Sequence, residues 1–244
     1  MANRHQEGSV LVTGGSNGIG RATIERLLED DYDVINLDIA RPTQVLPGEA
    51  YVEADLANPD SLREALLKAT SGRHITRLVN NAGIVRPAAI DVVTASDLQA
   101  VVAVNLTAVI TCVQAVLPAM REAKFGRIVN ISSRAALGKS ERIAYSATKA
   151  GLHGLTRTLA LELAADGVTV NAIGPGPIAT ELFQRVNPPG APATTRIVDA
   201  IPVRRMGEPA EVAHMVSGLL DARAGFTTGQ VIYVCGGMTV GLAT

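Results

Sequence analysis

A tyrosine and a lysine four residues apart, Tyr145 and Lys149, form the pair in this chain best suited to acid–base chemistry. The segment around them favours a helix, and residues four apart on a helix lie on the same face. A free tyrosine has a pKa of about 10 and is a poor base at neutral pH, but a nearby ammonium favours its phenolate. The pair therefore predicts a tyrosine that exchanges a proton with a substrate oxygen, with the lysine as its activator.

A glycine-rich run near the N-terminus predicts a site for phosphate groups. Gly14, Gly18 and Gly20 stand between an apolar run typical of a strand and a helical pattern. Glycines let the backbone turn sharply and approach a pyrophosphate, which then meets the N-terminal end of the helix. Three glycines also occur in ordinary turns. Their place directly after the first expected strand favours a dinucleotide site.

An acidic residue, Asp38, ends the second apolar run of the chain. A carboxylate about twenty residues beyond the glycine run can accept hydrogen bonds from both ribose hydroxyls and repel a 2′-phosphate. The alternative is an ordinary loop aspartate. The spacing favours the ribose role and predicts NAD(H) as the cofactor. Arg41 is the residue that argues for NADP(H), because a guanidinium there could reach a 2′-phosphate.

These residues are separated by short β-rich runs that alternate with longer helical patterns. Such alternation predicts an α/β fold, a single domain over residues 1–244 with a parallel sheet of about seven strands and helices on both faces. The expected strands are Ser9–Thr13, Asp33–Leu37, Ala50–Glu53, Arg77–Asn80, Gly126–Ser132, Val168–Ile173 and Gln230–Val234. The expected helices are Gly18–Asp30, Pro59–Thr70, Ala95–Glu122, Ile143–Ala165 and Pro209–Asp221.

Two connections depart from this pattern. Residues 39–50 hold two prolines and a glycine and are too short for a helix with its loops, so an irregular crossover is expected. The proline-rich segment around 178–205 has no clear periodicity before Thr194. A long irregular stretch in a compact chain is more often functional than a plain connector, so this segment is predicted to be a substrate lid.

Composition narrows the class of protein. A net charge of −1 gives no electrostatic reason to expect nucleic acid or a membrane surface as a partner. The first eight residues lack the apolar stretch of a secretory signal, which predicts a cytoplasmic protein. The apolar stretch 101–117 is interrupted by polar residues and is expected to be a buried helix. Cys112 and Cys235 are expected to be reduced core thiols, and the four scattered histidines make a metal site improbable.

Together, the Tyr145–Lys149 pair and the glycine-rich run resemble the short-chain dehydrogenase/reductase family, and the match extends over nearly the whole chain. The resemblance implies a Rossmann-type, doubly wound sheet. Further segments match the family in order: one contacts the adenine, one closes the fourth strand under the cofactor, and one holds the nicotinamide carboxamide. The residues implied in cofactor binding are Gly14, Ser16, Asn17, Gly18, Ile19, Gly20, Asp38, Asp55, Leu56, Asn81, Ala82, Gly83, Tyr145, Lys149, Pro175, Gly176, Ile178 and Thr180.

The resemblance also implies a catalytic group of four residues, Ser133, Tyr145, Lys149 and Asn105. The serine would hydrogen-bond the reacting oxygen, and the asparagine would hold a water that relays protons to the lysine. Many members place the serine thirteen residues before the tyrosine, which would select Ser132. We expect Ser133, because strand register is harder to shift than a loop is to shorten by one residue. A buried Asn105 would also need hydrogen bonds of its own.

The predicted function is NAD(H)-dependent hydride transfer between the cofactor and a secondary alcohol or ketone. Reduction of 3-oxoacyl thioesters is the alternative, and a non-catalytic dinucleotide sensor is a remote one. Basic residues on segments that surround the family's substrate cleft suggest a substrate with an acidic end, and apolar lid residues suggest an apolar body. The basic residues are Arg86, Arg134, Lys139, Arg142 and Arg185, and the apolar ones are Leu182, Phe183 and Val186.

Small residues on the helix that carries Tyr145 would allow another helix to pack closely against it. They are Ser146, Ala147, Ala150, Gly151 and Gly154. With the family resemblance, they lead us to expect a homotetramer.

Overall fold

A seven-stranded, wholly parallel sheet organises the computed structural model, which describes residues 8–240 except for the side chains of Leu182 and Val186. The strand order is β3-β2-β1-β4-β5-β6-β7. The strands are β1 (Ser9–Thr13), β2 (Val34–Asp38), β3 (Glu49–Glu53), β4 (Ile75–Asn80), β5 (Gly126–Ile131), β6 (Val168–Pro175) and β7 (Val231–Val234). The predicted α/β fold is therefore confirmed, and each expected strand is present to within two residues at either end.

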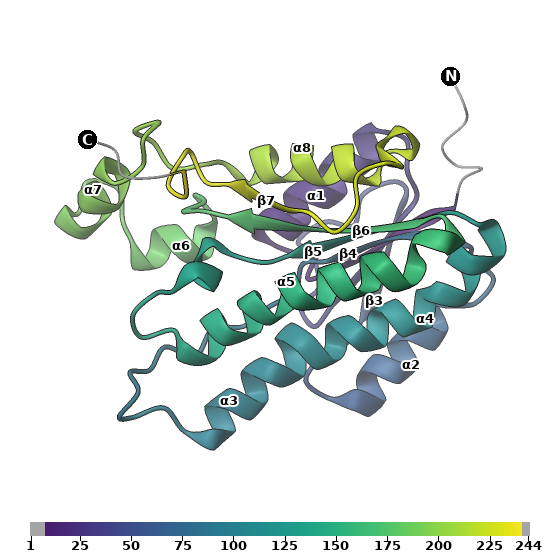
Figure 1. Ribbon diagram of the computed structural model, residues 1–244, viewed down its shortest axis with the longest axis horizontal. Helices are drawn as coiled ribbons and strands as arrows, with labels where there is room; N and C mark the ends of the chain where they lie inside the picture. The colour runs from purple at the N-terminus through teal and green to yellow at the C-terminus, as the bar shows by residue number, and fades with distance from the viewer. Residues whose placement is uncertain (1–7, 241–244) are drawn as a thin grey trace.

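Helices cover both faces of the sheet (Figure 1). On one face lie α1 (Gly18–Glu29) and α8 (Pro209–Leu220), which pack against each other. On the other lie α2 (Pro59–Thr70), α4 (Ala108–Ala123) and α5 (Ile143–Leu163). The alternation along β1 explains both contacts, since Val10 and Val12 join the core under α1 and α8, while Leu11 joins the core under α2, α4 and α5.

The chain leaves β1 and β4 in opposite directions across the sheet, although these two strands are neighbours. β2 and β3 lie on one side of β1, and β5, β6 and β7 lie on the far side of β4. Ligands bind parallel α/β sheets outside the carboxyl ends of the strands at such a reversal. The loops after Thr13 and Asn80 meet there, and they hold the glycine run and the residues from Asn81 to Gly83.

One long apolar helix is interrupted by a change of pitch. α3 (Ala95–Val102) passes through a π-helical turn, Ala103–Thr107, into α4. By length and composition Ala95–Ala123 could cross a membrane. Here Cys112, Val116 and Met120 are buried in the core against the sheet, as predicted for an interior helix. Single π-turns occur often at functional sites, and this one contains Asn105.

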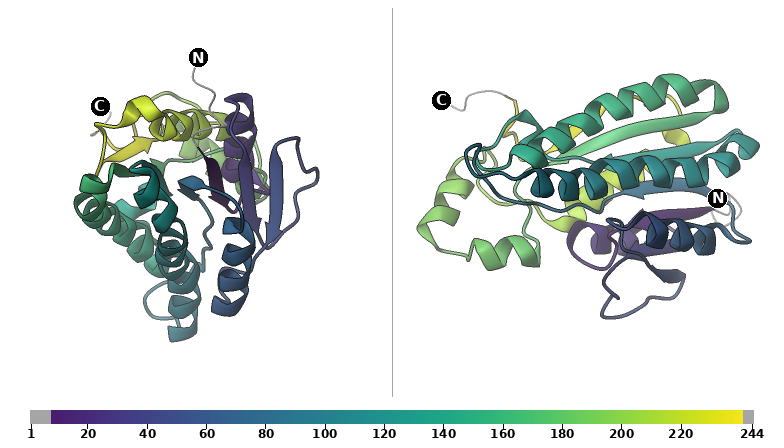
Figure 2. Two further views of the ribbon diagram at one scale, coloured as in Figure 1. Left: turned by 90° about the vertical axis from the view of Figure 1, so that its right-hand side faces the viewer. Right: turned by 90° about the horizontal axis from the view of Figure 1, so that it is seen from below.

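The sequence predicted that the segment around 178–205 is irregular before Thr194, and the structure corrects this prediction. The segment contains α6 (Glu181–Val186) and α7 (Pro192–Asp199), which extend beyond the carboxyl end of the sheet (Figures 1 and 2). Thr180 caps the first of them by accepting a hydrogen bond from Phe183 N, and Pro192 begins the second. Both helices are too short to show a clear period. The crossover over residues 39–48 is irregular, as predicted.

Candidate active site

A cavity of about 630 Å³ lies at the carboxyl ends of β1, β2, β3 and β4. Its walls come from the loops after these strands and from the start of α1 and of α6. The predicted cofactor residues that line it are Gly14, Asn17, Gly18, Ile19, Asp38, Asp55, Leu56, Asn81, Ala82, Gly83 and Thr180. The structure thus brings most of the predicted dinucleotide site into one hollow.

The glycine run turns the chain from β1 into α1. Gly14 and Gly18 have φ values of 66° and 54°, in the left-handed region that favours glycine. Gly20 packs closely against the loop, because a Cβ there would come within 2.0 Å of Gly14 O, and its predicted cofactor contact stays a prediction. It packs the helix against the loop and does not line the cavity. The first turn of α1 contains no acidic residue, so its amide groups and positive dipole can receive an anion.

Asp38 is held in place by two backbone amides. Its Oδ2 accepts a hydrogen bond from Ser16 N at 2.9 Å, and its Oδ1 accepts one from Ala40 N at 3.0 Å. The predicted contact residue Ser16 is itself buried and its hydroxyl donates to Ala40 O at 2.5 Å, so it braces the carboxylate and does not line the cavity. Arg41 is exposed and lies outside the cavity wall. A carboxylate fixed at this wall can accept hydrogen bonds from ribose hydroxyls.

Two positioning residues, Thr13 and Asn36, were missed by the sequence analysis. Thr13 Oγ1 accepts hydrogen bonds from the backbone amides of Asn81 and Ala82, at 3.0 and 3.1 Å. Asn36 Oδ1 accepts one from Gly15 N at 3.1 Å. Together they hold the loops after β1 and β4 at a fixed spacing. A polar Asn36 inside the apolar strand Val34–Asp38 was the signal that could have found it.

The side chains of Asn81 and Asp55 also form hydrogen bonds with backbone groups. Asn81 Nδ2 donates to Thr13 O at 3.0 Å and to Gly14 O at 2.8 Å, and Asp55 Oδ1 accepts from Ala57 N at 2.9 Å. These bonds fix the shape of the cavity wall. Contact with a cofactor at these two positions is therefore expected mainly through backbone and apolar surfaces, with Leu56 beside Asp55.

Three predicted cofactor residues at the end of β6 do not line the cavity. Pro175 is the last residue of the strand, and a Cβ at Gly176 would come within 2.8 Å of Cys235 Cα. Ile178 is buried in the core under α1 and α8 and forms an isolated bridge with Gly207. Their role in the structure is to direct the chain toward Thr180, which lies at the cavity wall next to Gly18.

Ser133 and Tyr145 lie near each other in the structure. Ser133 lies just after β5, and its Oγ accepts a hydrogen bond from Ala135 N at 3.1 Å. Its side chain is also close enough to Tyr145, near the start of α5, to act in the lowering direction on the pKa of the phenol. Ser132 faces away, because its Oγ donates to Lys149 O at 2.8 Å and lies 2.8 Å from His153 Nε2. The structure therefore brings Ser133, and not Ser132, together with the tyrosine.

Lys149 is buried on the same helix, one turn after Tyr145. Its Nζ donates to Ile131 O at 2.7 Å and lies 5.7 Å from the centroid of the Tyr145 ring. The side chain is 3% exposed, and this burial lowers its pKa to about 8. The ammonium is thus near the phenol but is bonded to the end of β5.

The pKa of Tyr145 departs from the sequence prediction. Burial raises it, and this effect outweighs the Ser133 side chain and the positive charge of Arg142, which both act in the lowering direction. We predicted a lowered value from Lys149, to which the positive nicotinamide ring of an oxidised cofactor would add. Periodicity gives the neighbourhood of two side chains but not the desolvation that the fold imposes on them.

Asn105 is fully buried within the π-helical turn. Both the oxygen and the nitrogen of its side-chain amide form hydrogen bonds. Its Oδ1 accepts from Ile84 N at 2.9 Å, and its Nδ2 donates to Ile84 O at 3.1 Å and to Thr148 Oγ1 at 3.2 Å. A Cβ at Gly83 would lie 3.2 Å from Lys149 Nζ and 3.3 Å from Asn105 Oδ1. Asn105, Gly83 and Lys149 therefore converge, while the predicted water relay stays a prediction.

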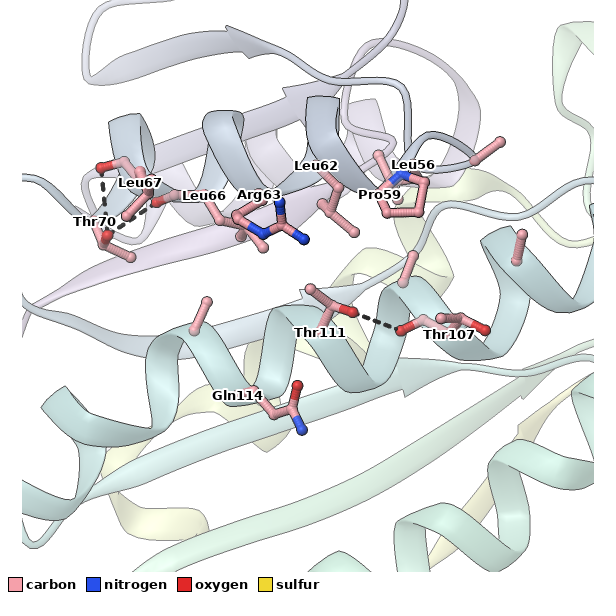
Figure 3. Close-up of a pocket in the computed structure, with 14 residues that line it drawn as sticks. Leu56, Pro59, Leu62, Arg63, Leu66, Leu67, Thr70, Thr107, Thr111 and Gln114 are labelled. Carbon is pink, nitrogen blue, oxygen red and sulfur yellow. Dashed lines mark hydrogen bonds between the residues drawn. The ribbon is translucent and has the colours of Figure 1, made fainter.

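A second, apolar cavity of about 400 Å³ lies between α2 and α4 (Figure 3). Leu62, Leu66 and Thr111 point into it. It shares Leu56 and Ala57 with the first cavity, and none of the four predicted catalytic residues lines either cavity. Cys112, on α4 behind it, is buried and free, as is Cys235, which confirms the expectation of core thiols.

Comparison with known proteins agrees with this geometry. A family model described as enoyl-(acyl carrier protein) reductase matches residues 14–239. The chain is 41% identical over 234 residues to an acetoacetyl-CoA reductase from Shinella zoogloeoides, covering 93% of this chain and 96% of the relative. It is 40% identical over 245 residues to a 3-oxoacyl-[acyl-carrier-protein] reductase from a Synechocystis strain, covering 94% and 96%. A solved structure of ElxO with NADP bound has a TM-score of 0.88 at 28% identity, covering 96% and 99%.

The fold and the site define a nicotinamide-dependent oxidoreductase that acts on carbonyl or alcohol groups. The chain belongs to the short-chain dehydrogenase/reductase family. Its residues fit the cofactor of that family, because the glycine turn, the α1 amides and the fixed Asp38 carboxylate face one cavity. Whether that cofactor is NAD(H) or NADP(H) is a finer question, taken up below.

Proposed function

We propose that the protein is an NAD(H)-dependent oxidoreductase that interconverts a secondary alcohol and a ketone, and that the ketone is a 3-oxoacyl thioester. The placement of the Ser133 side chain close enough to Tyr145 to act on its pKa supports the catalytic half of the proposal. The sequence prediction put an unspecified alcohol or ketone first and the thioester second. The relatives at 41% and 40% identity, named for acetoacetyl-CoA and 3-oxoacyl reduction, favour the thioester.

The chemistry divides between the cofactor and the chain. A bound nicotinamide supplies or accepts the hydride. Ser133 donates a hydrogen bond to the reacting oxygen, and Tyr145 gives that oxygen a proton during reduction or takes it during oxidation. A tyrosine whose pKa is raised stays protonated at neutral pH, which suits it to be the proton donor in ketone reduction. Lys149 keeps a positive charge near the phenol and binds the nicotinamide ribose.

The choice of NAD(H) rests on Asp38. Its two oxygens are fixed by backbone amides at the wall where a ribose would lie. A 2′-phosphate about 4 Å from this carboxylate would be repelled by up to about 4 kcal/mol at an effective dielectric near 20. The NADP in the ElxO structure supports the opposite choice, at 28% identity. We favour the charge at this position in this chain over the cofactor of a distant relative.

A substrate panel tests the proposed function. The purified protein is assayed with NADH and with NADPH against acetoacetyl-CoA, acetoacetyl-N-acetylcysteamine and simple ketones. We expect the thioesters to have the highest kcat/KM, and NADH to be preferred. Turnover of simple ketones alone would favour the unspecified ketone reductase. Tight NADH binding with no turnover of any carbonyl compound would favour the non-catalytic sensor.

We also propose that the protein is a cytoplasmic homotetramer in which residues 178–205 close over the substrate. Leu161 on α5 is 84% exposed and Ile110 on α4 is 43% exposed, so both helices present apolar surface that a second copy could cover. Light scattering at micromolar concentration measures the assembly. A monomeric mass would remove the tetramer but would leave the catalytic proposal intact.

A further inference from the structure

Three positive side chains gather beside the proposed catalytic pair. Arg134 directly follows Ser133 and begins a short 3₁₀ turn, and Lys139 and Arg142 lie on the loop that leads from this turn into α5. The pKa of Lys139 is lowered first by partial burial and then by the positive charges of Arg142 and Arg134. The three charges are therefore close enough to repel one another. The charge of Arg142 also reaches Tyr145, where it acts to lower the pKa of the phenol.

These three cations lack a counter-charge in the described part of the chain. Between residues 8 and 240, no ion pair joins Arg134, Lys139 or Arg142 to an acid, and Arg142 donates only to the backbone oxygen of Glu141, at 2.9 Å. The Glu141 side chain is exposed. Arg134 Nε is buried without a hydrogen-bond partner. Three like charges close together, one of which has a buried donor without a hydrogen-bond partner, destabilise the folded protein unless an anion binds among them.

Of the two other basic residues that the sequence placed at the cleft, Arg185 lies at the cofactor cavity and pairs with Glu181 at 3.4 Å. Arg86 is exposed and lies two residues before Ala88, which forms an isolated bridge with Arg142. The pKa of Asp97 is lowered first by hydrogen bonds from Thr94 and more weakly by the Arg86 charge. Three of the five predicted cations thus lie in a cluster on the loop between β5 and α5.

We infer that Arg134, Lys139 and Arg142 form a subsite for an anionic oxygen group of the substrate, held close to the reacting ketone. This inference rests on the proposed function, because it assigns the substrate class of the same site. A guanidinium forms charge-assisted, bidentate hydrogen bonds with a carboxylate, and Arg134 is adjacent to the serine that holds the reacting oxygen. That adjacency favours a carboxylate on the acyl chain over a phosphate at the far end of a thiol arm.

Matched substrates separate the two sources of the anion. The first pair is a 3-oxoacyl N-acetylcysteamine thioester whose chain ends in a carboxylate, and the methyl ester of the same compound. The second pair is acetoacetyl-CoA, which carries phosphates, and acetoacetyl-N-acetylcysteamine, which carries none. Each pair is assayed with wild type, Arg134→Gln, Arg142→Gln and the double variant. Arg73→Gln removes one exposed positive charge after the end of α2, away from the loop between β5 and α5, and is the matched control.

We expect wild type to prefer the carboxylate over its methyl ester at least about tenfold in kcat/KM, and the cluster variants to reduce that preference about 10- to 100-fold. Activity with the neutral ester should be retained, which shows that the variants fold, and Arg73→Gln should keep the wild-type preference. A loss confined to the CoA pair would support the subsite with phosphate as its anion. The subsite is overturned if both preferences are unchanged in the variants.

The neutral thioesters separate failure of this inference from failure of the proposed function. If wild type reduces them but the cluster variants change no preference, the function stands and the subsite is wrong. If wild type reduces none of the thioesters, neutral or anionic, the proposed function is wrong, and the subsite as the site of a thioester substrate is wrong with it.

Discussion

The two ends of the active-site crevice differ in how their polar groups are satisfied. At the cofactor end, Asp38 and Asn81 each make two hydrogen bonds to backbone groups. At the substrate end, Arg134 Nε is buried without a partner, and Lys139 and Arg142 repel each other. The polar groups named at the cofactor end are therefore satisfied without a ligand. The cations at the substrate end gain an opposite charge only when an anion binds.

This contrast teaches which part of the site is general and which is particular to this protein. A dinucleotide presents the same pyrophosphate and ribose groups in every reaction, so a rigid wall built from backbone bonds suits it. A substrate differs from one enzyme to the next, and its binding groups stand on the loop between β5 and α5, where sequence can change without disturbing the sheet. The serine and the tyrosine lie between the two ends.

Replacing each of the two neighbouring serines by alanine tests which of them takes part in catalysis. Ser133→Ala should lower kcat/KM for ketone reduction about 100-fold or more, because it removes the hydrogen bond that positions the reacting oxygen. Ser132→Ala should cost less than about tenfold, since that hydroxyl bonds Lys149 O and His153. Steady-state kinetics with both variants measures the difference. The opposite ranking would move the catalytic role to Ser132.

The rigid cofactor end is tested by Asp38→Ala. The change should weaken NAD(H) use and tolerate a 2′-phosphate, so the NADH-over-NADPH ratio of kcat/KM should fall about 10- to 100-fold. Asp91→Ala, at an exposed loop residue, is the control and should leave the ratio unchanged. A wild-type enzyme equally efficient with both cofactors would contradict the assignment and would point to Arg41.

The pH profile of reduction tests Lys149. Its pKa is lowered by burial to about 8, so its positive charge is present below pH 8 and is lost as the pH rises through that value. Tyr145, whose pKa is raised above its usual value of about 10, stays protonated over this range. We expect kcat/KM to be level from about pH 6 to 7.5 and then to fall about tenfold per pH unit. A level profile up to pH 10 would remove the charge requirement.

The fold could be predicted almost completely from the sequence because its strands and longer helices have strong periods. Ser9–Thr13 and Pro59–Thr70 have the predicted bounds. The helices α6 and α7 were missed because each spans at most two turns and follows prolines. The π-helical turn was invisible to periodicity, because one extra residue in a turn alters the spacing too little.

The candidate site was predictable where residue type and spacing carry the chemistry, as at Tyr145, Lys149 and Asp38. It was less so where the fold decides the environment. Sequence placed Ile178 against the cofactor, whereas the structure buries it in the core. Burial, which raises the pKa of Tyr145, follows from the whole fold and from no short motif.

Replacement of Tyr145 by phenylalanine is the most direct test of the central claim, that a tyrosine between a rigid cofactor end and a variable substrate end transfers the proton. Tyr233→Phe is the matched control, because Tyr233 lies on β7 and is not among the predicted catalytic or cofactor-binding residues. We predict that Tyr145→Phe lowers kcat/KM for ketone reduction 10²–10⁴-fold while the Kd for NADH, measured by calorimetry, changes less than about threefold. Retention of more than about a tenth of the wild-type kcat/KM would contradict the account.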